Sequence, residues 1–175
     1  GGTKIEAVLL APDGSQTWRQ RVATPAGDYG ATVAVLAALV ARARAAVPAP
    51  FSIGVGTPGA VAASGLMKNC NSTCLNGMPL QADLELAFGQ PVVLANDANC
   101  LALSEATDGA GASADVVFAV ILGTGAGAGI AVQGRVLQGP HRLAGEWGHN
   151  PLPWAEAGRD PVFDCYCGQR GCIET

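Results

Sequence analysis

Charged residues are scarce in this chain. Lysine, arginine, aspartate and glutamate make up 14% of its 175 residues, the formal net charge is −4, and no run of basic residues occurs. The chain therefore lacks the positive surface that binds nucleic acid or an anionic membrane. We also find no apolar run that predicts a bilayer-spanning segment and no secretory signal. Hydrophobic residues, at 49%, are ample for a globular core.

An initiator methionine is also missing, because the chain begins Gly1-Gly2-Thr3. It stops at Thr175, directly after a cysteine-rich segment. We therefore expect a fragment, with an N-terminal α/β domain over residues 1–113 and the start of a second α/β domain over residues 114–175. Free thiols beside a thiolate cluster favour a reducing, cytoplasmic location; the cysteines outside the cluster are Cys70, Cys74 and Cys100.

The cysteine-rich segment contains a Cys-x-Cys-x₄-Cys pattern preceded by a histidine: His149, Cys165, Cys167 and Cys172. One imidazole and three thiolates suit a tetrahedral zinc ion. Protein ligands would fill all four positions and leave none for an activated water, so we expect a structural metal. A loop fixed in this way would hold the neighbouring carboxylates of Glu146 and Glu174 ready for a polyhydroxylated ligand.

The alternative for these cysteines is a set of disulfides or of buried thiols. A Cys-x-Cys pair is a poor intramolecular disulfide, because an extended intervening residue holds the two side chains on opposite faces. Zinc is therefore the favoured interpretation.

Strand-like and helical segments alternate along the first hundred residues. Pro12-Asp13-Gly14 predicts a turn between two strands of a hairpin. Helical spacing of apolar residues, and a proline near a helix start, predict two helices. The predicted order is strand 4–10, strand 15–23, helix 28–47, strand 52–56 with a sharp turn at 57–59, a polar connection over 60–78, helix 79–88 and strand 91–95. Ligands of open α/β sheets bind at the carboxyl ends of such strands.

Asp97 lies where the strand over 91–95 passes into a helix whose body is 100–106. One interpretation is an ordinary helix N-cap, a common use of aspartate. The other is a general base, because amides at a helix N-terminus keep a carboxylate ionised and able to accept a proton. The residues alone leave both open.

Another strand-like run, residues 114–123, leads into the glycine-rich stretch Gly123–Gly129. A dinucleotide-binding fingerprint would require a helix next, whereas an alternating strand and a Gln133-Gly134 turn follow. We therefore expect a phosphate-cradling turn between two strands, with backbone amides and the Thr124 hydroxyl facing the anion. The opening Gly1-Gly2-Thr3 permits a similar role, although a plain tight turn is the better interpretation of it.

The connection over 60–78 is rich in asparagine. Asparagine offers both donors and acceptors, which suits sugar hydroxyls. For Asn76-Gly77 we favour simple turn chemistry.

Three blocks together resemble the ROK family of sugar kinases and sugar-responsive repressors: Gly123–Gly129, residues 144–149 and the Cys165-x-Cys-x₄-Cys-x-Glu174 ending. The similarity runs from Gly2 to Thr175 and is greatest to the bacterial fructokinase, or manno(fructo)kinase, branch. It implies an actin-like ATPase fold, with two ribonuclease H-like domains closing over a hexose and ATP. The first strand, whose acidic residue helps to hold Mg²⁺ in the family, and most of the second domain would be missing here.

Site residues follow from this resemblance position by position. Asp97 would be the catalytic base. Sugar would be bound by Gly59, Asn71, Asn96, Asp97, Glu146, His149 and Glu174. ATP phosphates would lie on Gly1, Gly2 and Thr3 and on Gly123, Thr124, Gly125, Ala126, Gly127, Ala128 and Gly129. Structural Zn²⁺ would be bound by His149, Cys165, Cys167 and Cys172. One ring nitrogen of His149 would bind metal while the other donates outward.

The activity implied is transfer of the γ-phosphoryl group of MgATP to the 6-hydroxyl of a hexose. Fructose is the favoured substrate, with glucose, mannose or an N-acetylhexosamine as alternatives. A sugar-responsive transcriptional repressor is the alternative from another class. We expect the full-length protein to be a homodimer without nucleic-acid or membrane partners, and the 175 residues alone to be inactive.

Overall fold

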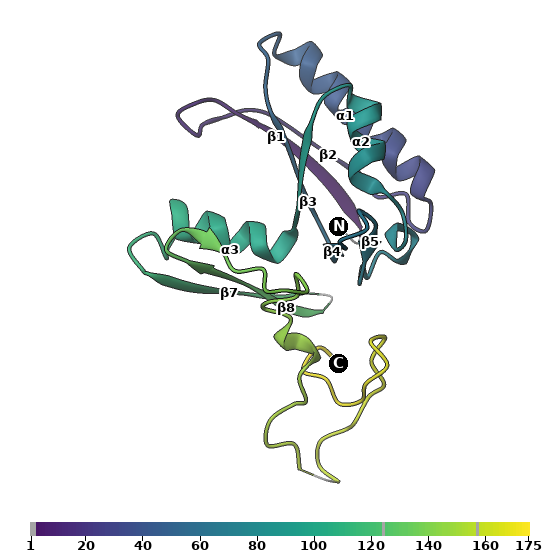
Figure 1. The fold of residues 1–175 in the computed structure, drawn as a ribbon, viewed down its shortest axis with the longest axis vertical. Coiled ribbons are helices and arrows are strands. Elements are labelled where there is room, and N and C mark those ends of the chain that lie inside the picture. The colour runs from purple at the N-terminus through teal and green to yellow at the C-terminus, as the bar shows by residue number, and fades with distance from the viewer. Residues whose placement is uncertain (1–2, 124, 157) are drawn as a thin grey trace. The chain divides into compact units, whose positions relative to one another are not determined.

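The computed structural model describes residues 3–123, 125–156 and 158–175 (Figure 1). The chain forms two compact units, of which the first ends at Asn96 and the second begins at Asp97. Each unit contains both helices and strands. The domain boundary that we expect between residues 113 and 114 stays a prediction.

The first unit opens with the predicted hairpin. Strands β1 (Lys4–Leu10) and β2 (Gln16–Ala23) pair antiparallel. The turn between them is stabilised by Asp13, whose side chain accepts hydrogen bonds from the backbone and hydroxyl of Ser15, at 2.9 and 2.6 Å. Gly14 takes the left-handed conformation there, at φ +83°. The hairpin prediction is therefore confirmed.

Two helices lie side by side in this unit (Figure 1). Helix α1 (Tyr29–Ala46) begins after Asp28, which caps it by accepting from Ala31 N at 2.8 Å. Helix α2 (Leu80–Phe88) ends at Gly89 in the left-handed conformation. Arg44 joins the two, because its guanidinium donates to the Phe88 carbonyl at 2.7 Å.

The core of the first unit lies under these helices. Its buried residues are Met67, Cys70, Leu75, Leu80, Leu84, Phe88 and Val92, and apolar residues of α1, β3 and β6 pack against them. Leu84 is completely buried, and burial of such a side chain is worth about 1.5–3 kcal/mol. By length and composition alone α1 is apolar enough to cross a membrane, so the prediction that no such run exists was wrong. One side of it packs against this core through partly buried residues that include Val33, Leu36 and Val40.

Strands β3 (Ile53–Thr57) and β6 (Val92–Asn96) pair in parallel with the register Ile53↔Val92 to Thr57↔Asn96. Because both strands end together, the turn after Thr57 and the side chain of Asn96 share one edge of the pair. This is the edge at which the sequence predicts ligands.

Residues 60–78 contain more regular structure than the polar connection that the sequence predicts. They contain the short antiparallel strands β4 (Ala60–Val61) and β5 (Met67–Lys68), followed by a 3₁₀ turn, η1 (Thr73–Leu75). Met67 and Leu75 are buried in the core. A few apolar residues therefore anchor the segment in the core, although its overall composition is polar.

The second unit is built on a three-stranded antiparallel sheet and one helix. Strands β7 (Val116–Leu122), β8 (Ala126–Val132) and β9 (Arg135–Val136) follow in order, and α3 (Asp97–Thr107) packs against β7 and β8. Small side chains let the helix come close: Ala102, Ala119 and Ala131 form the buried cluster between them. The outward face of β7 is apolar and exposed, through Val116, Phe118, Val120 and Leu122.

The last forty residues of the chain contain little regular structure. A single 3₁₀ turn, η2 (Trp147–His149), precedes the cysteine-rich loop in the described part of this segment. In Figure 1 this loop is the yellow irregular segment that ends at the C-terminus.

Candidate active site and metal centre

Gly145 and Gly148 allow the segment 145–149 to pack directly on β8. A Cβ atom at Gly148 would lie 1.8 Å from the Ala126 carbonyl oxygen, and one at Gly145 would lie 2.3 Å from that of Ala128. Gly145 also has φ +94°. Only glycine fits such close backbone contacts. Glu146, Trp147 and His149 are therefore positioned by direct packing on the sheet.

The structure brings together the four predicted metal ligands. The ligand atoms of His149, Cys165, Cys167 and Cys172 all lie within 4.8 Å of one another. The Cys165 sulfur is 3.5 Å from His149 Nδ1, and the sulfurs of Cys167 and Cys172 are 3.8 Å apart. All six cysteines are free thiols.

These distances fit zinc better than a disulfide. Two sulfurs at about 2.3 Å from one ion in tetrahedral geometry lie about 3.8 Å apart, and a sulfur and an imidazole nitrogen about 3.6 Å apart. A disulfide would need its sulfurs about 2.05 Å apart. The donor set and these two distances therefore fit a tetrahedral zinc ion, which Nδ1 of His149 would bind.

Neighbouring groups shift the pKa values of two cluster thiols in opposite directions. Burial, with hydrogen bonds and charge from the other two sulfurs, raises the pKa of Cys172 to about 12. The pKa of Cys167 is lowered, chiefly by a hydrogen bond from the Gln169 backbone. A divalent cation reverses this balance, because it stabilises every thiolate that faces it.

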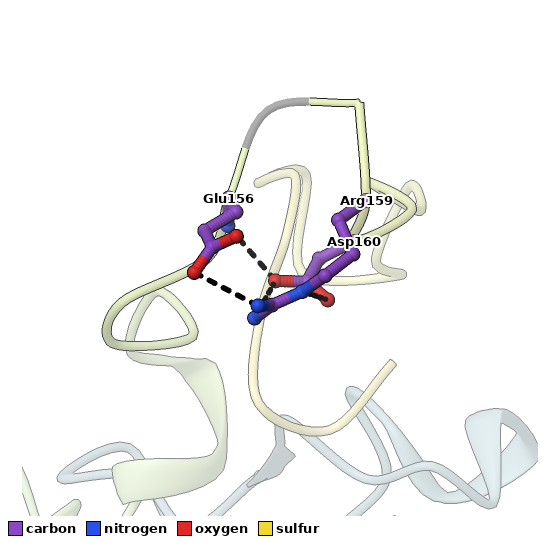
Figure 2. Close-up of polar contacts among 3 residues, drawn as sticks. All are labelled: Glu156, Arg159 and Asp160. Atoms are coloured by element: carbon purple, nitrogen blue, oxygen red, sulfur yellow. Dashed lines mark hydrogen bonds and ion pairs between the residues drawn. The ribbon is translucent and has the colours of Figure 1, made fainter.

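Backbone hydrogen bonds hold the loop between His149 and the cysteines. Pro151 pairs with Cys172 as an isolated bridge, and Ile173 N donates to Asn150 O at 2.9 Å. Figure 2 shows an ion-pair cluster within the loop: the Arg159 guanidinium lies 2.8 Å from a Glu156 oxygen and 3.1 Å from an Asp160 oxygen. Surface ion pairs of this kind add little stability.

Three carboxylates gather near this centre. Glu174 is fixed by its backbone N–H, which donates to Gly148 O at 2.9 Å, and by its Oε2, which accepts from Ala126 N at 3.3 Å. Desolvation raises the pKa of Glu146; the charge of His149 lowers it, and the carboxylates of Glu174 and Asp97 raise it. Asp97, Glu146, His149 and Glu174 therefore form one electrostatic neighbourhood within the second unit.

Asp97 is the first residue of α3 and is exposed. Its Oδ1 accepts from the next backbone N–H, that of Ala98, at 2.9 Å. A capping aspartate instead accepts from the amide two or three residues further on. This contact is therefore not the ordinary cap pattern, and the base role stays a prediction.

The predicted hairpin is present, because β7 and β8 pair antiparallel, but β8 already begins at Ala126, so residues 126–129 lie in the strand rather than in the turn. Two glycines of the glycine-rich stretch have packing roles. A Cβ at Gly129 would lie 2.2 Å from the Ala98 carbonyl oxygen of α3, and one at Gly125 would lie 2.7 Å from Glu174 Oε2. Gly1, Gly2 and Thr124 lie outside the described residues. The ATP role of both loops, Thr3 included, stays a prediction.

In the first unit, two of the predicted sugar ligands meet. The Asn96 side chain donates to the Gly59 carbonyl at 3.0 Å. Gly59 has φ +71°, and a Cβ there would lie 2.4 Å from Lys68 O. Asn71 is exposed in a loop closed by Asn76, whose Oδ1 accepts from Cys70 N at 2.8 Å. Turn chemistry therefore explains Asn76, as the sequence indicates.

Tyr166 is the site residue that sequence reasoning missed. Its hydroxyl lies 3.2 Å from His149 Nε2, and the two rings meet edge to face with centroids 5.3 Å apart. Desolvation, followed by the charge and hydrogen bond of Glu174, raises the pKa of Tyr166 to about 12. The available signal was a phenol placed between two metal ligands in sequence.

The described residues combine an α/β architecture, an antiparallel hairpin of a glycine-rich strand and a Cys₃His cluster. The sequence model of the ROK family matches residues 1–175, and the chain belongs to this family. The predicted fold class, α/β of the actin-like, ribonuclease H-like type, is thereby confirmed.

Two curated relatives and one solved structure show which proteins of the family this chain is similar to. The chain is 40% identical over 180 residues to an N-acetyl-D-glucosamine kinase of Vibrio cholerae, covering 100% of this chain and 60% of the relative. It is 37% identical over 177 residues to an N-acetylgalactosamine kinase of a Shewanella species, covering 100% and 58%. A ROK glucokinase from Streptomyces griseus, solved with glucose and AMPPNP, matches with a TM-score of 0.84 at 32% identity, covering 99% of this chain and 54% of that one. The chain thus spans about 60% of these curated relatives.

Proposed function

We propose that the full-length protein transfers the γ-phosphoryl group of ATP, with Mg²⁺, to the 6-hydroxyl of an N-acetylhexosamine in the cytoplasm. The observation that carries the proposal is the electrostatic grouping of Asp97, Glu146, His149 and Glu174 beside the β7–β8 hairpin. Acidic side chains suit sugar hydroxyls, and a glycine hairpin suits phosphate.

In this proposal Asp97 accepts the proton of the sugar hydroxyl as the phosphoryl group is transferred. Such transfer depends on positioning and charge neutralisation more than on covalent chemistry. General-base assistance is typically worth ~10²–10⁴-fold in rate. Glu146 and Glu174 orient the sugar, while Gly59, Asn71 and Asn96 stay proposed sugar ligands from the first unit.

Zinc has a structural role here, through His149, Cys165, Cys167 and Cys172. Bound there it would fix the loop that carries His149 and Glu174, and all of its ligands would come from protein.

The curated relatives support the N-acetylhexosamine alternative over fructose, because the two compared above are named as kinases of N-acetylglucosamine and N-acetylgalactosamine. A sugar-sensing regulator of the same family would need the sugar ligands but no base at Asp97. Turnover itself therefore separates the kinase from the regulator.

A coupled kinase assay of the full-length protein tests the proposal. The sugars compared are N-acetylglucosamine, N-acetylgalactosamine, glucose, mannose and fructose, at fixed MgATP. We expect kcat/KM for one N-acetylhexosamine to exceed that for fructose by at least about tenfold, which corresponds to ~1.4 kcal/mol. A preference for fructose would return the assignment to the fructokinase alternative, and no turnover with any sugar would reject the kinase.

A further inference from the structure

The hydroxyl of Tyr166 lies on the far side of His149 from the cysteine sulfurs. It is 3.2 Å from Nε2, whereas Nδ1 is 3.5 Å from the sulfur of Cys165. The imidazole therefore has one nitrogen toward the proposed metal and the other toward a phenol. The edge-to-face contact of the two rings, with an interplanar angle of 85°, fixes the orientation of both.

Glu174 acts on the same hydroxyl, since its charge and a hydrogen bond to it are among the causes that raise the pKa of Tyr166. An ionised carboxylate only accepts hydrogen bonds, so the phenol donates its single proton to Glu174. The phenol oxygen is then free to accept from Nε2–H of His149. A neutral imidazole with its proton on Nε2 has its lone pair on Nδ1.

We propose that Tyr166 is a positioning residue that connects Glu174 to His149, holds the imidazole in its Nε2–H form and so presents Nδ1 to the metal. The chain of contacts runs from Ala126 through Glu174 and Tyr166 to His149. It makes metal retention depend on a side chain that is not a ligand. Through Glu174 it also links the metal centre to sugar affinity, a second consequence that rests on the proposed function.

Zinc retention is the direct test. In the full-length protein Tyr166→Phe removes only the hydroxyl, and the rate of zinc release to a chromophoric chelator is measured together with the apparent zinc Kd. Loss of an outer hydrogen-bond partner typically weakens metal binding about 10–100-fold, and we expect a loss in this range. Tyr29→Phe is the matched control, because the Tyr29 hydroxyl is also bonded to a carboxylate, that of Asp83, and lies in the other unit. Zinc affinity within about twofold of wild type in Tyr166→Phe would overturn the proposal.

A second variant keeps the test decisive if Tyr166→Phe folds poorly. Glu174→Leu leaves all four ligands and Tyr166 in place but removes the acceptor of the phenol proton, and Glu174→Gln keeps an acceptor oxygen. We expect faster zinc release in Glu174→Leu and near wild-type release in Glu174→Gln. Equal release from both would overturn the proposed chain of contacts.

Sugar kinetics test the link to Glu174 separately. We expect Tyr166→Phe to raise the sugar KM several-fold with little change in the ATP KM, because Glu174 loses its donor. An unchanged sugar KM would overturn this second consequence even where zinc is lost faster. If no hexose is phosphorylated, the proposed function fails, and the zinc measurements still decide the role of Tyr166.

Discussion

Glu174 and Ala126 are joined by a hydrogen bond, in which Oε2 of the carboxylate lies 3.3 Å from the backbone nitrogen. Glu174 follows the last cysteine of the cluster by two residues, and Ala126 is the first residue of β8. The hydrogen bond therefore ties the end of the cysteine-rich loop to the glycine hairpin. Whatever holds Cys172 in place also holds a carboxylate that we propose to bind sugar.

Loss of zinc should accordingly weaken sugar binding. We expect Cys172→Ser in the full-length protein to lower the zinc content, lower the melting temperature and raise the sugar KM about 10–100-fold, the range for lost metal-site support. The matched control is Cys74→Ser, the same substitution in the first unit and outside the cluster. Zinc analysis, thermal melting and sugar kinetics measure the effects. A Cys172→Ser protein with full zinc content and unchanged sugar KM would show that Cys172 is not a ligand of a structural metal.

Substitution of Gly129 distinguishes a role in the packing of α3 from a role in phosphate binding. A Cβ in Gly129→Ala would lie 2.2 Å from the Ala98 carbonyl oxygen, so α3 must shift. Overpacking of this kind costs about 1–3 kcal/mol, and we expect a lower free energy of unfolding by denaturant. Gly127→Ala is the control, because its Cβ meets no atom within 4 Å. Equal stability of the two variants, with a raised ATP KM in Gly129→Ala alone, would show that Gly129 serves the nucleotide rather than the helix.

We expect the stability of the first unit to depend on pH through Glu6. Two arginines of β2 donate hydrogen bonds to Glu6: Arg19, and Arg21, which is its cross-strand partner. These hydrogen bonds, that of Arg19 first, hold the pKa of Glu6 below its usual value of 4.5. A lowered folded pKa means that this ion pairing stabilises the fold above pH 4.5 and is lost as the pH falls through the folded pKa. We therefore expect Glu6→Gln to be less stable than wild type at neutral pH, with a difference that vanishes in acid.

Denaturant unfolding of wild type and Glu6→Gln across this pH range measures the effect. The difference should also shrink in about 1 M salt, where the screening length is about 3 Å. A difference that stays constant with pH would mean that the carboxylate charge of Glu6 is not the cause.

Much of the fold was predictable because its signals are local. Turn residues such as Asp13 and Gly14 and the cap Asp28 mark ends of elements, and apolar spacing fixes their type. Residues 60–78 were harder, because Met67 and Leu75 reach the core from an otherwise polar segment. Burial there depends on tertiary contacts that no short window shows.

The candidate site likewise contains residues that could be predicted from the sequence and residues that could not. The metal ligands were predictable, since residue types and spacing define a donor set. The roles of Gly129 and Gly148 as sites of close backbone packing were not, because they depend on which strand or helix passes nearby. The sequence pattern assigns no role to Tyr166, and its contact with His149 appears only once the loop is folded.

The most direct test of the account is the kinetics of Asp97→Asn in the full-length protein. An asparagine of nearly the same shape cannot take up the proton of the hydroxyl, so kcat should fall ~10²–10⁴-fold. Binding of the sugar, measured by calorimetry without ATP, should stay within a few-fold of wild type. Such a loss of turnover with retained binding supports Asp97 as the base of a sugar kinase, whereas turnover near the wild-type rate would contradict it.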